Sequence, residues 1–449
     1  MTAHKFSKTD FIVMALGNIV GSGIFLASSA VISSAGAWAP LAYLLGGLIM
    51  MMEVSFIIEM SIAKPVPGAF KAHAQEIFGE WWGFVNGWMF WTSAVLGMSS
   101  EITACALFTR LWLPSVPLWL LSLLFAILIT LINLNDLKGL SKAEAVLAAT
   151  KISAIVLFVI FGGLVAFGLP IGGATPNFSE FHAALATPWE GVAGLLGSML
   201  IILYAYTGTG IIGLAATETH NAEKVVPSAT RIVTYSVVSL YTVAVFLIIT
   251  LLPTESLDPD TSPFVSILTI FKIPYAANIL NFILLTAALS SLNSQVYSAS
   301  RMLFSMAKSN QAPKVVGRQN AKGVPVAAIW MSGLVLLGTA LLSYLLPEKL
   351  FLYTICASGV LALVNWLSVS ATHYFFRKKI LAEAPEKLKY RAPFYPYLSW
   401  ICFFTVLITL LSAPLYPDQL PGFYSGTLLL LLISIAYFLI PLKNPNQPK

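Results

Sequence analysis

Long apolar stretches alternate with short polar segments along the whole chain. Each stretch is near the length that an α-helix needs to cross a bilayer, about 20 residues. The stretches are continuously apolar and do not alternate residue by residue, so they favour helices over the strands of a membrane β-barrel. The pattern predicts an all-α membrane protein with twelve transmembrane helices, at residues 10–33, 38–63, 81–110, 116–135, 143–168, 189–216, 231–252, 275–306, 325–346, 349–376, 395–414 and 421–441.

Composition supports a bilayer as the solvent for most of the chain. Of the 449 residues, 58% are hydrophobic and 10% are charged, and the mean hydropathy is +0.83. A soluble domain usually has about 25% charged residues, so a soluble globular or a disordered chain is excluded. The three cysteines lie in apolar stretches and suggest no disulfide framework. Between the predicted helices, no segment is long enough for a separate soluble domain.

The distribution of basic residues predicts the orientation. With the N-terminus in the cytoplasm, 21 of the 25 Lys and Arg residues fall in cytoplasmic segments, three fall outside and one, Lys151, lies within a helix. Cytoplasmic loops of membrane proteins carry this excess. The pattern predicts a multi-pass protein of the cell membrane with cytoplasmic tails at 1–9 and 442–449. The net charge of +6 then belongs to membrane loops, so no nucleic-acid partner is expected.

Two glycine clusters interrupt predicted membrane helices, at residues 17–25 and 204–213. Close helix packing through small residues explains a single cluster. The pair occupies equivalent places if residues 10–168 and 189–376 are two five-helix repeats, with 395–441 added after them. An odd number of helices inverts the second repeat, and paired interrupted helices in inverted repeats indicate a transporter binding site.

The physical chemistry of such breaks suggests the ligand. An unwound turn at mid-membrane frees N–H and C=O groups that need partners. The N-terminus of the second half-helix suits a carboxylate, and the carbonyls that end the first half-helix suit an ammonium. A zwitterionic amino acid supplies both charges.

Several motifs resemble the amino acid–polyamine–organocation superfamily, within it the bacterial amino acid permeases. The similarity extends over nearly the whole chain and is carried by Gly21-Ser22-Gly23-Ile24-Phe25, Glu59-Met60, Gly87-Trp88, Glu101-Ile102-Thr103-Ala104, Asn365-Trp366 and, most specifically, the segment from Asn293 to Phe304. The resemblance implies the leucine-transporter fold, a 5+5 inverted repeat with helices 1 and 6 broken, and alternating access.

The resemblance also implies a substrate site at the two breaks. Its residues would be Ile19, Gly21, Ser22, Gly23, Ile24, Tyr204, Ala205, Tyr206, Thr207, Gly208 and Gly210. The main chain around Ser22 would hold the carboxylate, and carbonyls such as that of Ile19 would hold the ammonium. Tyr204 or Tyr206 would cover the site. Many relatives carry an acidic residue at the position of Gly210, and its absence here argues for neutral substrates.

The resemblance implies that Lys151 and Glu101 couple transport to protons. The Lys151 ammonium would replace a sodium ion and hold carbonyls near 17–20 and the hydroxyl of Ser290 or Ser291. A lysine reaching the headgroups is the alternative. Glu101 would carry a proton, and a neutral, hydrogen-bonded core glutamate is the equal alternative. Glu53, in the middle of 38–63, has no assigned role.

The leading interpretation is therefore a permease that imports neutral amino acids with protons. An amino acid exchanger without net proton flow is the alternative. A channel or a substrate-sensing receptor belongs to another class and would require a continuous polar lining. The five histidines show no metal-ligand spacing, and no nucleotide-binding or metalloprotease motif occurs. We expect neither catalysis, nor a cofactor, nor a bound metal.

Overall fold

The structure is a computed structural model, and most of the described residues are in helices. It describes residues 7–66, 68–134, 140–169, 176–186, 188–216, 219–253, 256–258, 261–273, 275–321, 323–346 and 349–439. The predicted C-terminal tail, 442–449, and most of the predicted N-terminal tail lie outside these residues. The division into repeats stays a prediction.

Every predicted membrane range overlaps helix in the described part of the chain. The helices are α1 (Lys8–Ile19), α2 (Ser22–Phe25), α3 (Ser28–Ala35), α4 (Ala39–Ala63), α5 (Ala69–Phe78), α6 (Glu80–Arg110), α7 (Leu118–Asn133), α8 (Leu140–Ala166), α9 (Ser179–Ala186), α10 (Pro188–Ala205), α11 (Gly210–Ala216), α12 (Ala222–Leu251), α13 (Pro263–Ile270), α14 (Ala276–Lys308), α15 (Val326–Leu345), α16 (Leu350–Glu383), α17 (Tyr397–Ser412) and α18 (Leu420–Leu439). The short helices α5, α9 and α13 lie outside the predicted ranges.

Length and composition qualify nine helical segments of the described chain as able to cross a membrane. The 16-residue α7 and the 12-residue α1 are too short to be among the nine. Outward-facing leucines and isoleucines are common on the peripheral helices, and Leu428, Leu431 and Ile435 of α18 are each more than half exposed. Rows of exposed apolar side chains like these are typical of surfaces that face lipid. The all-α membrane fold is confirmed, whereas the number of twelve crossings stays a prediction.

The two predicted helix breaks are present. The first leaves Val20 and Gly21 in extended conformation between α1 and α2. The second leaves residues 206–209 outside regular helix between α10 and α11. Gly208 has φ of +93°, a left-handed conformation that residues with a side chain rarely adopt. Glycine at this position therefore allows the chain to turn out of α10.

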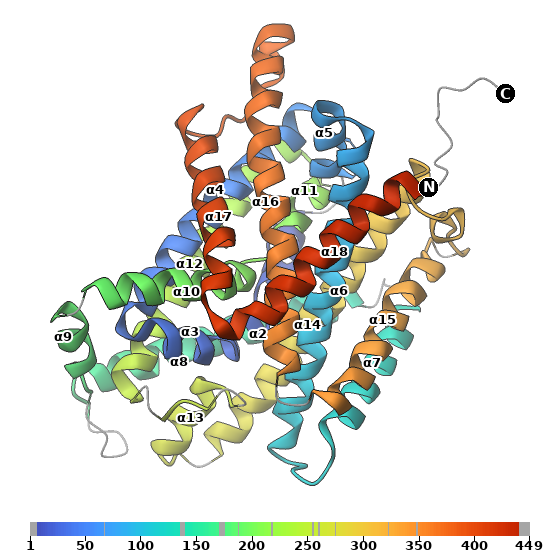
Figure 1. The fold of residues 1–449 in the computed structure, drawn as a ribbon. Helices are drawn as coiled ribbons and strands as arrows, with labels where there is room; N and C mark the ends of the chain where they lie inside the picture. Colours follow the sequence, from blue (N-terminus) through green and yellow to red (C-terminus); the bar gives the residue numbers. More distant parts are fainter. Residues whose placement is uncertain are drawn as a thin grey trace.

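The interrupted helices meet in the interior. A Cβ on Gly23 would lie 2.8 Å from the Ala205 Cα, so the two segments approach too closely for a side chain there. The Asn18 Nδ2 also donates a hydrogen bond of 2.7 Å to the Gly208 carbonyl. Around them, α1 packs on α8, α12 and α14. Helix α6 packs on α14 and α16 (Figure 1). The breaks are thus enclosed by long helices.

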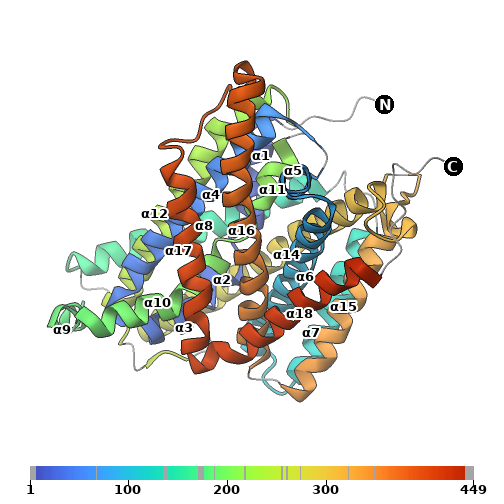
Figure 2. The ribbon, with the colours of Figure 1, turned by 45° about the horizontal axis from the view of Figure 1, so that its top comes forward.

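Further helices complete the periphery. Helices α7 and α15 run side by side, and α17 and α18 both pack on α16 (Figures 1 and 2). A buried polar cluster joins α4 to α16. The Glu59 carboxylate of α4 lies 3.3 Å from His373 Nε2 and 3.2 Å from Arg377 Nη1, both of α16. Arg377 also lies over the Tyr395 ring, at 4.6 Å. This network fixes α4 against α16, which positions the wall of the cavity described next.

Candidate substrate site at the helix breaks

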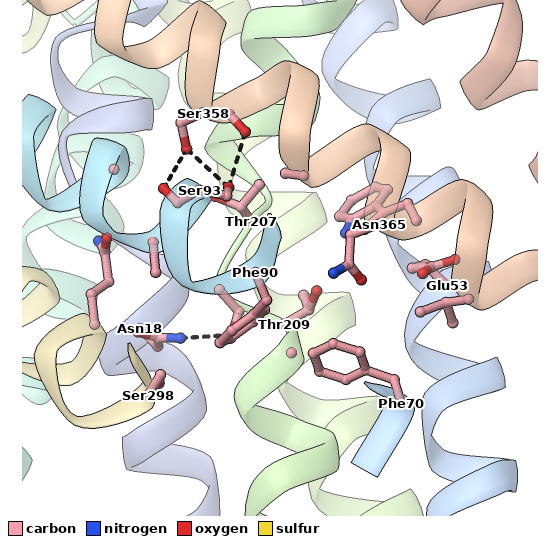
Figure 3. Close-up of a pocket in the computed structure, with 18 of the residues that line it drawn as sticks. Asn18, Glu53, Phe70, Phe90, Ser93, Thr207, Thr209, Ser298, Ser358 and Asn365 are labelled. Carbon is pink, nitrogen blue, oxygen red and sulfur yellow. Dashed lines mark hydrogen bonds between the residues drawn. The ribbon is translucent and has the colours of Figure 1, made fainter. Parts of the chain in front are cut away.

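A cavity opens beside the second break, with about 700 Å³ of space when its open side is included. Seven parts of the fold enclose it: α1, α4, α5, α6, the α10–α11 break, α14 and α16. Its lining residues are Asn18, Glu53, Ile57, Phe70, Phe90, Ser93, Ala94, Gly97, Thr207, Gly208, Thr209, Gly210, Gln295, Ser298, Ser358, Ala362, Asn365, Trp366 and Val369 (Figure 3). The wall is mostly apolar with a few polar groups, as in typical small-molecule sites.

The α10–α11 break contributes main chain to this wall. The Tyr204 carbonyl accepts the Thr207 N–H at 2.8 Å and the Thr207 hydroxyl at 2.6 Å, so the turn satisfies part of its own main chain. The Gly208 carbonyl accepts from Asn18. The Thr209 hydroxyl is buried and has no hydrogen-bond partner among the described residues. This hydroxyl on the cavity wall is a ready contact for a polar ligand.

Hydrogen-bonded side chains from α6, α14 and α16 form another part of the wall. The Ser93 hydroxyl donates to the Ser358 carbonyl at 2.9 Å, and the Ser358 hydroxyl donates to the Ser93 carbonyl at 2.8 Å (Figure 3). The Gln295 Nε2 donates to the Ser291 hydroxyl at 3.1 Å, and that hydroxyl donates to Glu101 Oε1 at 3.2 Å. A hydrogen-bonded chain therefore leads from the cavity to Glu101.

The first break is filled by a side chain of the protein. The Ser22 N–H, at the N-terminus of α2, lies 3.1 Å from both carboxylate oxygens of Glu101. Glu101 is buried, and so is Ser22, whose hydroxyl has no partner among the described residues. The carboxylate expected of a substrate at this helix end is supplied here by α6.

Lys151 lies at the other side of the first break. Its side chain is fully buried, and Nζ donates to the Gly17 carbonyl at 2.8 Å and to the Val20 carbonyl at 3.0 Å. The Ala287 carbonyl of α14 lies at 3.5 Å. These carbonyls end α1, where a cation is favoured. The Gly17 and Val20 carbonyls lie in the segment that the resemblance implied as the partner of Lys151. Because the ammonium is bound there and the side chain is fully buried, Lys151 does not reach the headgroups in this conformation.

The predicted site residues fall into two groups. Thr207, Gly208 and Gly210 line the cavity. The others surround the breaks without lining it: Ile19, Gly21, Ser22, Gly23, Ile24, Tyr204, Ala205 and Tyr206. The Tyr206 hydroxyl donates to the Tyr43 carbonyl at 3.0 Å and its ring stacks on Tyr241. Tyr204 is hydrogen-bonded to Ser100. Both rings are thus held in the protein interior in this conformation.

Most of the cavity wall was absent from the predicted site. Asn18 belongs to the first glycine cluster, Gln295 to the most specific motif, and Asn365 and Trp366 to a further motif, so these residues could have been included. Ser93 and Ser358 are single serines in long helices, and only the packing of α6 against α16 brings them together. Glu53 was noticed without a role, and the structure places it on the wall.

Comparisons with known proteins agree with the fold and extend over nearly the whole chain. The family model for amino acid permeases matches residues 10–444. The amino-acid permease RocC of Bacillus subtilis strain 168 is 34% identical, with 99% of this chain and 96% of that protein covered. The aromatic amino acid transport protein AroP of Escherichia coli K12 is 33% identical (95% and 93%), and the γ-aminobutyric acid permease of B. subtilis is also 33% identical (91% and 87%).

Two solved structures share the architecture. MhsT in complex with L-phenylalanine superposes with a TM-score of 0.59 at 18% identity, covering 92% of this chain and all of that chain. A manganese transporter from Eremococcus coleocola gives a TM-score of 0.55 at 13% identity, with 96% and 92% covered. At these identities the likeness concerns the fold, which is that of the leucine transporter.

Proposed function

Because this chain belongs to the amino acid permease family, we propose that it imports neutral amino acids with protons by alternating access. The observation that carries the proposal is the cavity at the α10–α11 break, which Thr207, Gly208, Thr209 and Gly210 line and where the Thr209 hydroxyl has no hydrogen-bond partner among the described residues. Groups of this kind bind the charged ends of a small zwitterion without a fixed countercharge on the protein.

Proton coupling is supported by the two ionisable groups at the first break. The Lys151 ammonium occupies the carbonyls that end α1, and a metal cation placed beside it would be repelled. Glu101 is joined to the cavity through Ser291 and Gln295. A proton taken up by Glu101 would weaken its hold on the Ser22 N–H and free that donor for a substrate carboxylate. Binding of proton and substrate would then favour each other.

The neutral substrate class is supported by Gly210. This residue lines the cavity, and the family resemblance leads us to expect an acidic side chain at its position in relatives that carry cations. Two of the three relatives named above are described as carriers of aromatic amino acids and of γ-aminobutyric acid, neither of which carries a net positive charge, and the description of RocC gives no substrate class.

Alternating access is supported by the construction of the breaks. Residues 206–209 lie outside regular helix, and Gly208 adopts a φ value that residues with a side chain rarely take. Half-helices joined by such turns can rotate separately from the helices around them.

Uptake into proteoliposomes tests the proposal. The purified chain is reconstituted, and uptake of radiolabelled amino acids chosen from a thermal-shift screen is followed with an inward proton gradient. We expect accumulation against the substrate gradient that collapses with a protonophore and does not depend on sodium. Uptake that requires internal amino acid and ignores the proton gradient would instead identify an exchanger. Absence of any amino acid uptake would refute the proposal.

A further inference from the structure

Glu53 is a buried carboxyl on the wall of the cavity. It lies near the middle of α4, its side chain is 0% exposed, and Ile57, one turn further along α4, lines the same cavity. Figure 3 shows Glu53 and Asn365 on the side of the cavity away from Asn18 and Ser298. Glu53 is therefore placed to meet the end of a ligand whose other end lies at the helix break.

The hydrogen bonding of Glu53 is incomplete. Its Oε2 accepts from the Ser370 hydroxyl at 3.2 Å and faces the Cys402 Sγ at 3.9 Å. Its Oε1 is buried and has no hydrogen-bond partner among the described residues. An unsatisfied buried polar atom is costly, and native proteins leave few of them. A group that enters the cavity can remove this cost.

The surroundings of Glu53 favour its uncharged form. Within the part of the chain that the structure describes, no Lys, Arg or His side chain lies within ion-pair distance of its carboxyl group. A buried carboxylate without a cation carries a large desolvation cost, so such a group holds its proton. A neutral carboxyl presents one O–H donor and one acceptor oxygen side by side.

We propose that Glu53 selects amino acids whose side chain ends in a carboxamide. A carboxamide also presents an acceptor oxygen and N–H donors side by side, so it can accept from one carboxyl oxygen of Glu53 and donate to the other. The partly apolar wall, with Phe70, Phe90 and Trp366, would enclose the methylene groups. This inference rests on the proposed function and narrows its neutral substrates to the glutamine and asparagine class.

A matched pair of ligands tests the inference on the unaltered protein. Glutamine and methionine have side chains of similar length, and only glutamine can pair with Glu53. Dissociation constants are measured on the purified full-length chain by calorimetry, with all twenty amino acids screened first. We expect glutamine to bind at least about tenfold more tightly than methionine, as two additional neutral hydrogen bonds would give. Equal affinities would overturn the inference.

Two substitutions separate hydrogen bonding from charge. Glu53→Gln retains a donor and an acceptor, and should keep glutamine affinity within about threefold. Glu53→Met removes both, and should lower the glutamine-to-methionine preference by about tenfold. Glu80→Gln, at an exposed position in the first turn of α6, is the matched control and should change neither value. If Glu53→Met does not fold, the ligand pair on the unaltered protein still decides.

Each other outcome also has a meaning. A preference for lysine or arginine that disappears in Glu53→Gln would make Glu53 a charged partner of cations and overturn the carboxamide assignment. Methionine or leucine binding with no glutamine preference would overturn this inference and leave the proposed function intact. Failure of every amino acid to bind would overturn both.

Discussion

The two helix breaks share a sequence device but satisfy their exposed main chain in different ways. At the α1–α2 break, the Glu101 carboxylate meets the Ser22 N–H, and the Lys151 ammonium meets the Gly17 and Val20 carbonyls. At the α10–α11 break, Thr207 to Gly210 face a cavity, and the Thr209 hydroxyl has no partner among the described residues. The first break is filled by two ionisable side chains, and the second lines a cavity.

This difference suggests that the two breaks have different tasks, response to protons at the first and response to substrate at the second, whereas the sequence pattern placed both breaks in one substrate site. A break filled by ionisable groups of the protein can respond to protons, because protonation changes which main-chain groups are occupied. A break that faces empty space can respond to substrate. Asn18 links them, since it follows the Gly17 carbonyl that Lys151 holds and donates to Gly208 at the second break. Coupling between proton and substrate would then require only small movements at this contact.

The largest expected effect comes from removing the cation of the first break. In Lys151→Ala, the Gly17 and Val20 carbonyls lose their donor, at a cost of about 1–3 kcal/mol for each buried group. We expect proton-driven uptake to fall by on the order of a hundredfold, which corresponds to about 3 kcal/mol for the two carbonyls together. Initial uptake rates across a range of proton gradients measure this.

Two further variants separate charge from hydrogen bonding at this position. Lys151→Gln keeps an N–H donor, so its thermal stability should recover partly while proton-driven uptake stays low. Lys349→Ala changes an exposed lysine before α16 and should leave both properties unchanged. If Lys151→Gln shows the pH dependence of the unaltered protein, the division of tasks between the breaks is wrong.

The contact between the breaks gives the next largest effect. In Gly23→Ala, the added Cβ would lie 2.8 Å from the Ala205 Cα and 3.0 Å from its Cβ, so the half-helices must separate. We expect transport to fall by about tenfold or more, corresponding to an overpacking cost of about 1–3 kcal/mol. Gly338→Ala, where a Cβ would meet nothing within 4 Å, is the matched control. Equal transport by both variants would show that the breaks need no close contact.

The fold could be predicted far better than the site, for a physical reason. A run of about 20 apolar residues indicates a membrane helix, and glycines within such a run indicate a break in it. Both signals are local, so residues 17–25 and 204–213 were found. The cavity wall is built from a few residues on each of seven parts of the fold, and no local signal in the sequence indicates that Ser93 faces Ser358.

The sequence also could not show which groups occupy the main chain at each break. The main chain at Ser22 has the same potential to bind a carboxylate whether the carboxylate is a substrate's or that of Glu101. Only the packing of α6 against α2 and α14 brings Glu101 to this N–H. The contact of Lys151 with the Gly17 and Val20 carbonyls could be expected because the family resemblance supplied a partner segment that hydropathy alone does not provide, and its role in coupling stays a prediction.

A charge introduced at Gly210 on the cavity wall tests whether the second break selects the substrate. Gly210 lines the cavity, and the nearest atom to a Cβ added there is the end of the Phe90 ring, at 2.8 Å, which can shift. Gly210→Glu should therefore be tolerated and should improve uptake of lysine or arginine relative to leucine by several-fold, since each opposite charge nearby favours a cation. Competition of each amino acid against a labelled neutral substrate measures the ratio. An unchanged ratio would mean that this part of the wall does not meet the side chain.

The smallest expected effect concerns the hydrogen bond that joins the breaks. Asn18→Ala removes the 2.7 Å bond to the Gly208 carbonyl, and Asn281→Ala removes a bond of the same type and length, from Asn281 Nδ2 to the Phe108 carbonyl, away from the cavity. Each loss should lower stability by about 1 kcal/mol. Because only Asn18 lines the cavity, only its variant should weaken substrate binding, by about threefold. Thermal unfolding and substrate titration on both variants measure the two quantities, and equal binding by both would show that the link between the breaks serves stability alone.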